Sequence, residues 1–183
     1  EIVSQEFEWA GYVHDLVMLA QGPRVSVIVP NYNYAHHLPA RLRSILTQTY
    51  RPHEIVFLDD CSSDTSLEVA AELLGHGGIP FRIITNDKNQ GVYRQWLRGL
   101  QEATGDLVWI AEADDDCSSR LLGTLVPAFA NLDVVLAYCQ STQMDETGEP
   151  IAPDYLGWTA DVDDAKWRQP YVRRGTDEIR DSL

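Results

Sequence analysis

The sequence predicts an α/β protein in which a mostly parallel β-sheet carries helices on both faces. Two observations support this fold class. Short apolar runs typical of buried strands alternate repeatedly with segments of helical periodicity between residues 24 and 138. These runs are continuous rather than alternating, which is typical of parallel strands covered on both faces. Parallel strands of this kind are joined by right-handed crossovers, so their carboxyl ends meet at one edge of the sheet.

Each predicted element has a local pattern that supports it. Glu6–Ala20 carries apolar residues at helical spacing, and the Gly22-Pro23 pair after it is a typical helix end. Every predicted strand is a short apolar run bounded by polar or turn residues. The predicted strands are Arg24–Pro30, Glu54–Asp60, Phe81–Thr85, Leu107–Ala111 and Asp133–Tyr138. The later predicted helices begin near Leu38, Thr65, Val92, Arg120 and Arg173.

The chain divides into three predicted parts, because the alternation of strands and helices is confined to its middle. A length of 183 residues with 44% hydrophobic residues is enough for one good core. Residues 1–22 are a helical lead-in, residues 23–140 form the α/β domain, and residues 141–183 are a loop-rich region with one exposed helix.

Charge and cysteine usage restrict the partners and the compartment. The formal net charge of −14 disfavours nucleic acid and anionic membrane surfaces, because like charges repel. An acidic protein that binds a phosphorylated ligand needs a local cation or helix N-termini. The three cysteines have no paired spacing, which suits a reducing compartment and predicts a cytoplasmic location. The longest apolar runs are far short of a membrane span, and no signal peptide is visible.

Carboxylates follow two of the predicted strands directly. Glu112, Asp114 and Asp115 emerge from the run Leu107–Ala111, and Asp60 ends the run that starts at Glu54. Taken alone, the first cluster also fits a solvated acidic turn that caps the following helix. Two such constructions in one chain favour a ligand site at the edge of the sheet, where open α/β sheets bind ligands.

Four segments in this order resemble the successive motifs of family 2 glycosyltransferases. They are Val25–Asn33 (VSVIVPNYN), Asp59–Thr65 (DDCSSDT), Asn89–Gly91 (NQG) and Glu112–Asp115 (EADD). The resemblance covers roughly residues 24–138, and it lies in the order and spacing of the motifs. It implies a GT-A fold, a Rossmann-like three-layer sandwich, and sugar transfer from a nucleotide donor with inversion.

The resemblance also implies roles for single residues. Pro30 and Tyr32 would lie against the nucleotide base, Asp60 would accept a hydrogen bond from the base, and Asp114 would hold the ribose. Asp115 would bind Mg²⁺ or Mn²⁺ that bridges the donor diphosphate, since hard cations prefer oxygen ligands. The implied donor-binding set is Pro30, Tyr32, Asn33, Asp60, Asn89, Gly91, Arg94 and Asp114. The implied donor is a UDP- or dTDP-linked sugar.

The sequence departs from the family pattern at two places. Many relatives carry an Arg-Asn pair on the helix after the Asn-x-Gly motif, where this chain has Trp96 and Leu97. Arg94 and Arg98 are close enough in sequence to take the place of that arginine. The first residue of the acidic motif is Glu112, where Asp is commoner. These departures concern the identity of the donor more than the fold.

The general base for an inverting transfer is expected outside this chain. In the family resembled, that carboxylate follows the second acidic motif, in the acceptor half of the domain. Here the acids after Tyr138 stand in loop-like or exposed helical contexts. Residues 141–183 are therefore interpreted as an incomplete acceptor-side region within a longer, bacterial-type polysaccharide-synthesis protein. Its acceptor would be a glycan or a lipid-linked sugar, and other domains would bring it to the inner face of the membrane.

Three other classes of protein are alternatives to this interpretation. A sugar-nucleotide pyrophosphorylase needs a Gly-rich basic loop after the first strand, which the segment from Pro30 lacks. A phospho-acceptor receiver domain needs a lysine at the end of a late strand, and Lys88 and Lys166 lie elsewhere. The remaining alternative is a non-catalytic nucleotide-sugar-binding or scaffolding domain of the same fold.

Overall fold

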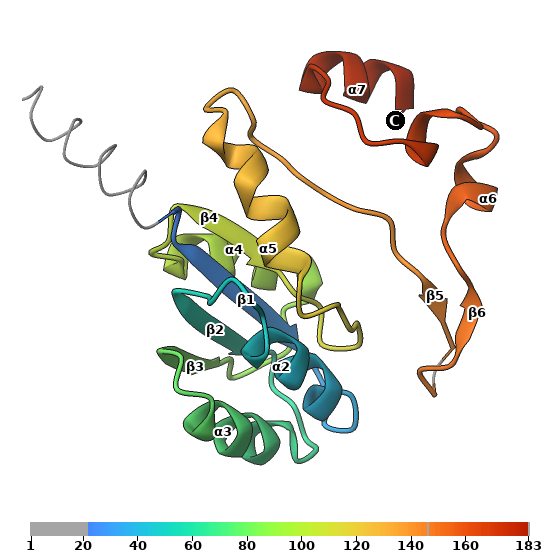
Figure 1. The fold of residues 1–183 in the computed structure, drawn as a ribbon. Coiled ribbons are helices and arrows are strands. Elements are labelled where there is room, and N and C mark those ends of the chain that lie inside the picture. The colour runs from blue at the N-terminus through green and yellow to red at the C-terminus, as the bar shows by residue number, and fades with distance from the viewer. Residues whose placement is uncertain (1–21, 146, 183) are drawn as a thin grey trace, which may run out of the picture. The chain divides into compact units, whose positions relative to one another are not determined.

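The computed structural model describes residues 22–145 and 147–182 (Figure 1). The helix predicted for Glu6–Ala20 lies outside these residues. The chain separates into two compact units, divided between Ala130 and Asn131, which are described one at a time. No helix among the described residues has both the length and the apolar character that crossing a membrane requires.

The first unit is built on a four-stranded parallel sheet with the order β3-β2-β1-β4. Its strands are β1 (Val25–Asn31), β2 (Glu54–Asp59), β3 (Phe81–Thr85) and β4 (Leu107–Ile110). All three strand pairs are parallel, which confirms the predicted sheet type. Strand β1 lies between β2 and β4, so the chain reverses its direction of winding at β1. Open α/β sheets bind ligands at such a point.

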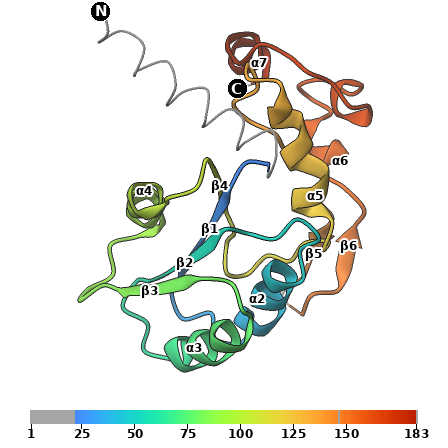
Figure 2. The same cartoon turned by 60° about the vertical axis from the view of Figure 1, so that its left-hand side comes forward.

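Helices cover both faces of this sheet, as predicted (Figure 2). The helices of the first unit are α2 (Leu38–Leu46), α3 (Ser66–His76), α4 (Val92–Glu102) and α5 (Leu121–Leu125), and α5 continues as the 3₁₀ helix η1 (Val126–Ala130). Alternate residues of β1 serve the two faces, because successive side chains of a strand point in opposite directions. Val27 and Val29 join the main core with apolar side chains of α2, α3 and α5. Ile28 faces α4 instead.

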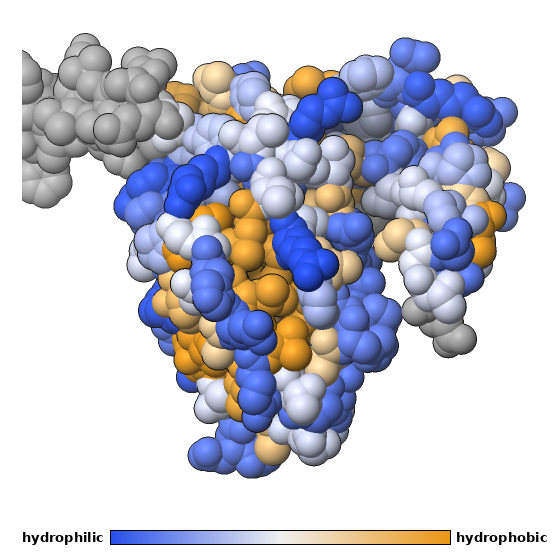
Figure 3. Space-filling model, turned by 60° about the horizontal axis from the view of Figure 1, so that its bottom comes forward, coloured by the Kyte–Doolittle hydropathy of each residue, from blue (hydrophilic) through white to orange (hydrophobic). Residues whose placement is uncertain are grey.

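Helix α4 packs against the sheet through a glycine. A Cβ atom on Gly99 would lie only 2.4 Å from Cγ2 of Ile28, so a larger residue would force the helix away from β1. This close packing places the N-terminus of α4, at Gly91, near the carboxyl ends of β1 and β2. Apolar side chains also gather in the middle of one face of this unit (Figure 3).

Two predictions about strands are wrong. Leu107–Ala111 was expected to be covered on both faces, but β4 is an edge strand and Val108 is 39% exposed. Asp133–Tyr138 was expected to be a buried strand, but it forms no strand, and Val135 and Leu136 are 87% and 74% exposed. An apolar run becomes a strand only where a neighbouring strand pairs with it. Within the described residues, this run has no such partner.

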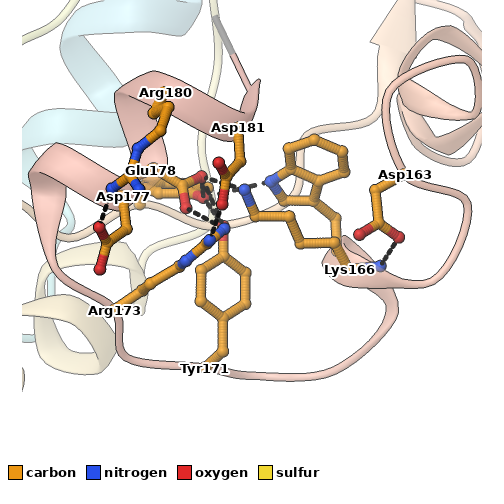
Figure 4. A network of polar contacts seen from close by, with 10 residues as sticks. Asp163, Lys166, Tyr171, Arg173, Asp177, Glu178, Arg180 and Asp181 are labelled. Carbon is orange, nitrogen blue, oxygen red and sulfur yellow. Dashed lines mark hydrogen bonds and ion pairs between the residues drawn. The ribbon is translucent and has the colours of Figure 1, made fainter.

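The second unit contains short elements held together largely by polar contacts. They are β5 (Gln143–Met144), β6 (Pro150–Ala152), α6 (Leu156–Thr159), the 3₁₀ helix η2 (Lys166–Arg168) and α7 (Gly175–Ser182). Helix α7 confirms the predicted terminal helix. Lys166 binds Glu178 at 2.8 Å and lies over the ring of Tyr171, and Arg173 pairs with Asp181 (Figure 4).

Glu54, at the start of β2, is a buried carboxylate that joins three elements of the first unit. Its Oε1 accepts hydrogen bonds from Ser26 Oγ at 2.7 Å and from Thr104 N and Oγ1 at 2.7 and 2.8 Å. Its Oε2 lies 3.3 Å from Nη2 of Arg82. Burial opposes the ionisation of Glu54, but these contacts outweigh it and lower the pKa of Glu54 to about 2.

The lowered pKa of Glu54 predicts how stability depends on pH. Its ordinary pKa is 4.5, so its stabilisation is complete above about pH 4.5 and is lost as the pH falls toward 2. A shift of this size corresponds to about 3 kcal/mol. Urea unfolding from pH 7 to pH 2.5 should show this loss in the wild type and a shallower profile in Glu54→Gln. The exposed Glu68→Gln change is the control, and parallel profiles for Glu54→Gln and wild type would contradict the prediction.

Candidate functional site

The carboxyl ends of β1, β2 and β4 meet at one edge of the sheet, as the sequence predicts. The side chains that follow them come from the segments Asn31–Tyr34, Asp59–Asp64 and Glu112–Asp116. The last of these is called the acidic loop below. The N-terminal end of α4 completes the edge, because the loop from Asn86 to Gly91 is fixed to β2.

Asp60 fixes that loop. Its side chain is buried, and the residue is only 2% exposed. Its two carboxylate oxygens accept hydrogen bonds from Asn86 Nδ2 at 2.7 Å, Gln90 N at 2.9 Å, Gly91 N at 2.8 Å and Gln95 Nε2 at 2.6 Å. Burial opposes ionisation, but these donors outweigh it and lower the pKa of Asp60. The carboxylate is therefore an internal anchor between β2 and α4, whatever else it contacts.

The loops after β1 and β2 are fastened to each other. Asn31 Nδ2 donates to Asp59 Oδ1 at 2.9 Å, and Ser62 N donates to Asp59 Oδ2 at 2.9 Å. Asn33 receives a hydrogen bond from Ser63 N at 2.8 Å. Asn33 and Cys61 have positive φ angles of 59° and 67°, which non-glycine residues seldom adopt. Such strain persists only where surrounding contacts hold it, and it clusters at ligand sites.

The acidic loop presents its carboxylates on different sides. Ala111 and Ala113 are buried, whereas Asp114 is exposed and the side chain of Asp115 is 66% exposed. The charge of Asp114 raises the pKa of Tyr34, because a phenolate would be repelled by the carboxylate. Asp114 thus faces the loop after β1. Asp115 lies near Arg41 of α2 instead, so the two neighbouring aspartates have different surroundings.

Arg41 of α2 is the main residue of this site that sequence reasoning missed. It is 2% exposed, and its Nε donates to the carbonyl oxygen of Glu112 at 2.7 Å. Its Nη2 lies 3.5 Å from Asp115 Oδ2, and its guanidinium lies 5.7 Å from the ring centre of Trp109. Loss of hydration raises the pKa of Asp115, Arg41 opposes this rise, and Asp114 adds to it. The sequence signal was a charged residue next to Leu42 on the apolar side of a helix.

The two places where the sequence departs from the family pattern contact each other. Nε1 of Trp96 donates to Oε1 of Glu112 at 2.6 Å. Burial raises the pKa of Glu112, the Trp96 hydrogen bond opposes the rise, and the nearby aspartates add to it. Arg98, named as a possible substitute for the family's arginine, donates to Asn86 Oδ1 instead. Arg94 is exposed on α4.

The remaining predicted residues take different positions at this edge. Tyr32 follows the end of β1 and is 46% exposed. Pro30 is buried within β1, where it pairs with Leu58 of β2. Asn89 is exposed in the loop that Asp60 holds, and Gly91 precedes α4 with a φ angle of 86°. Tyr32 is thus the predicted base-contacting residue with an accessible face.

The carboxylate oxygens of the acidic loop fit a hard divalent cation that takes most of its coordination shell from substrate phosphates and water. Among residues 22–145 and 147–182, no group of three or more His, Cys, Asp or Glu side chains is arranged so that it could hold a metal ion. Asp115 offers one exposed carboxylate. Mg²⁺ typically takes one or two carboxylates and completes its shell with substrate phosphates and waters.

The second unit contains a hollow of about 380 Å³. Its lining is formed by Asp163, Ala165, Lys166, Tyr171, Val172 and Arg173. The lysine and arginine in this lining are already paired with Glu178 and Asp181 (Figure 4). The charged side chains around this hollow are therefore engaged in ion pairs within the second unit. The strand ends of the first unit remain the candidate site.

Solved structures of glycosyltransferases share this architecture. A mannosyltransferase of Pyrobaculum calidifontis, in complex with GDP-Man and Mn²⁺, matches with a TM-score of 0.57 and 29% identity, covering 61% of this chain and 34% of that one. S. aureus TarS in complex with UDP-GlcNAc matches with a TM-score of 0.53 and 27% identity, covering 60% and 32%. The fold of the first unit is therefore that of the GT-A glycosyltransferases, as the sequence predicted.

The chain belongs to glycosyl transferase family 2, whose model matches residues 26–177. An uncharacterized glycosyltransferase of Nostoc sp. is 37% identical over 112 residues, which make up 61% of this chain and 34% of the relative. The uncharacterized glycosyltransferase YibD of Escherichia coli is 28% identical over 154 residues, or 82% and 44%. The chain thus spans less than half the length of these two relatives. The family and the neighbours support an enzyme of the glycosyltransferase class.

Proposed function

We propose that this chain is the donor-binding part of a metal-dependent, inverting glycosyltransferase. Its substrate would be a nucleotide-diphosphate sugar, and its acceptor a glycan or a lipid-linked sugar. The observation that carries the proposal is the edge formed by β1, β2 and β4. Tyr32, the loop anchored by Asp60, and the exposed Asp114 and Asp115 all follow the ends of these strands, which supports the proposal.

Each residue has a task that its environment suits. The exposed ring of Tyr32 offers a flat apolar surface for a nucleotide base. Asp60 accepts hydrogen bonds from the backbone N–H groups of Gln90 and Gly91, and it thereby holds the loop that carries Asn89 at the start of α4. Asp114 would accept hydrogen bonds from the ribose. Asp115 would hold Mg²⁺ or Mn²⁺, which when bound neutralises charge on the leaving diphosphate.

We place the general base outside residues 1–183. Among the described acids after Tyr138, none follows a strand of the parallel sheet, and several serve local contacts. Asp163 accepts hydrogen bonds from Ala165 N and Lys166 N at 2.9 Å, and Glu178 pairs with Lys166. Residues 141–183 would then be part of an acceptor-side region of a longer protein. An inverting transfer needs the base within hydrogen-bond reach of the acceptor hydroxyl.

Titration of this chain with UDP, dTDP and GDP, in Mn²⁺ and in EDTA, tests the donor-binding proposal. We expect one of these nucleotides to bind in Mn²⁺ and to bind at least about tenfold more weakly in EDTA, because Asp115 would hold the cation and the cation would neutralise charge on the diphosphate. A nucleoside without phosphates is the control. Equal affinity in Mn²⁺ and EDTA would contradict metal dependence, and no binding of any nucleotide would contradict the proposal.

Labelled donors then separate a catalytic from a non-catalytic protein. The full-length protein should transfer sugar to a glycan acceptor, whereas this chain alone should bind the donor and transfer it poorly. Binding without transfer by either protein would favour the scaffolding alternative. Equal turnover by the two proteins would show that the base lies within residues 1–183.

A further inference from the structure

Arg41 is a buried cation that lies directly against the acidic loop. It comes from the middle of α2, far in sequence from the loop, and it is 2% exposed. Its shortest contact, from Nε to the carbonyl oxygen of Glu112 at 2.7 Å, is with a neutral group. The ring of Trp109, at 5.7 Å from the guanidinium carbon, is also neutral. Neither contact cancels the positive charge.

The charge of Arg41 is only partly compensated by Asp115. The separation of 3.5 Å between Nη2 and Asp115 Oδ2 is longer than a good hydrogen bond between charged groups. The Asp115 side chain is 66% exposed, so water competes for it. Nη1 of Arg41 is buried and makes no hydrogen bond within residues 22–145 and 147–182. A guanidinium does not lose its proton in proteins, so this positive charge is permanent.

A permanent positive charge at this place acts in opposite directions on the two halves of a metal–diphosphate ligand. It repels a free divalent cation approaching Asp115, and it attracts the diphosphate. Both effects are stronger inside a protein than in water, because the effective dielectric constant is lower. The neighbouring carboxylates Glu112, Asp114 and Asp116 act with the opposite sign.

Building on the proposed function, we propose that Arg41 is a positioning residue and counter-charge through which the acidic loop prefers an anionic metal–diphosphate to the free cation. Arg41 holds the Glu112 carbonyl through its Nε and attracts Asp115 through its Nη2. It leaves the loop a weak binder of metal alone. The diphosphate would supply negative charge in addition to the partial compensation that Asp115 provides.

A purely supporting role for Arg41 predicts a different result. If Arg41 only held the loop in shape, its loss would weaken metal and nucleotide together. If Arg41 is a counter-charge, its loss weakens the diphosphate and leaves the metal bound at least as well. The two roles therefore differ in the sign of the effect on the cation.

The test compares Arg41→Met, Arg41→Lys and Arg43→Met with the wild type. Arg43 is exposed on the same helix, so its replacement removes the same charge away from the loop. Calorimetry gives the Kd of the nucleoside diphosphate that the wild type binds, in Mn²⁺ and in EDTA, and electron paramagnetic resonance measures binding of Mn²⁺ alone. We expect Arg41→Met to weaken the diphosphate about tenfold in both conditions without weakening Mn²⁺. Arg41→Lys should keep most of the affinity, and Arg43→Met should keep all of it.

Three outcomes would overturn this inference: an unchanged diphosphate affinity in Arg41→Met, a joint loss of Mn²⁺ and diphosphate, or an equal effect of Arg43→Met. Circular dichroism checks that each variant is folded. If Arg41→Met does not fold, Arg41→Lys decides, because a tenfold loss in that variant would show that charge alone is not the role. Failure of the wild type to bind any nucleotide would instead refute the proposed function.

Discussion

Replacement of Asp60 by alanine is expected to lower the free energy of unfolding by about 3–4 kcal/mol. The reason is that the change leaves several buried hydrogen-bond donors without an acceptor. Asn86 and Gln95 donate to this carboxylate from their side chains, and Gln90 and Gly91 donate from the backbone. Each buried donor left without an acceptor costs about 1–3 kcal/mol, and partial entry of water reduces the total.

Urea unfolding of Asp60→Ala and Asp87→Ala measures this effect. Asp87 is an exposed neighbour on the same loop, so its replacement should change stability by less than about 0.5 kcal/mol. Nucleotide affinity should also fall in Asp60→Ala, since the loop from Asn86 to Gly91 loses its anchor. Similar small effects of the two substitutions on unfolding would contradict the anchoring role.

The change Asp115→Asn should reduce metal-dependent nucleotide affinity by at least about tenfold to a hundredfold, while the fold survives. Losing even a group that only orients a metal ligand typically costs that much. The amide keeps the shape of the side chain, but it loses the charge that a divalent cation needs. The side chain is largely exposed, and the oxygen of an asparagine can still accept from Nη2 of Arg41, so we expect the fold to tolerate the loss of this ion pair.

The control for Asp115→Asn is the same substitution at Asp116. This neighbour also carries a charge on the acidic loop, and its Oδ1 accepts a hydrogen bond from Cys117 N at 2.7 Å. Calorimetry in Mn²⁺ and in EDTA should show that Asp115→Asn removes the difference between the two conditions and Asp116→Asn does not. Equal losses in both variants would indicate a general effect of charge instead of a metal ligand.

The sheet and the edge where the site lies were predictable from the sequence, because each depends on patterns that are local in the chain. β1 and β2 are continuous apolar runs, and their polar ends follow directly. The relative positions of Asp60 and the acidic loop then follow from the parallel order of the strands. The four family-like segments reinforced the same conclusion.

The internal contacts of the site were not predictable, because they join residues far apart in sequence. Nothing local in α2 indicates that Arg41 reaches Glu112, 71 positions later. The hydrogen bonds that Asp60 accepts from the following loop and from α4 also join residues far apart in sequence, so they were not predictable either. The error at Asp133–Tyr138 has a different cause, since a strand depends on a partner that a single run of residues does not reveal.

Within the described residues, β4 is the last strand on one side of the four-stranded sheet, and this position bears on how the chain behaves at high concentration. An edge strand can accept a further strand from another molecule, and exposed apolar side chains such as those of Val135 and Leu136 favour such contacts. The net charge of −14 opposes them, because copies of the chain repel one another. Added salt screens this repulsion within about 10 Å at 0.1 M. Strand pairing at the edge of the sheet therefore favours aggregation, and repulsion between acidic surfaces opposes it. We expect aggregation to increase with ionic strength, because salt weakens the repulsion.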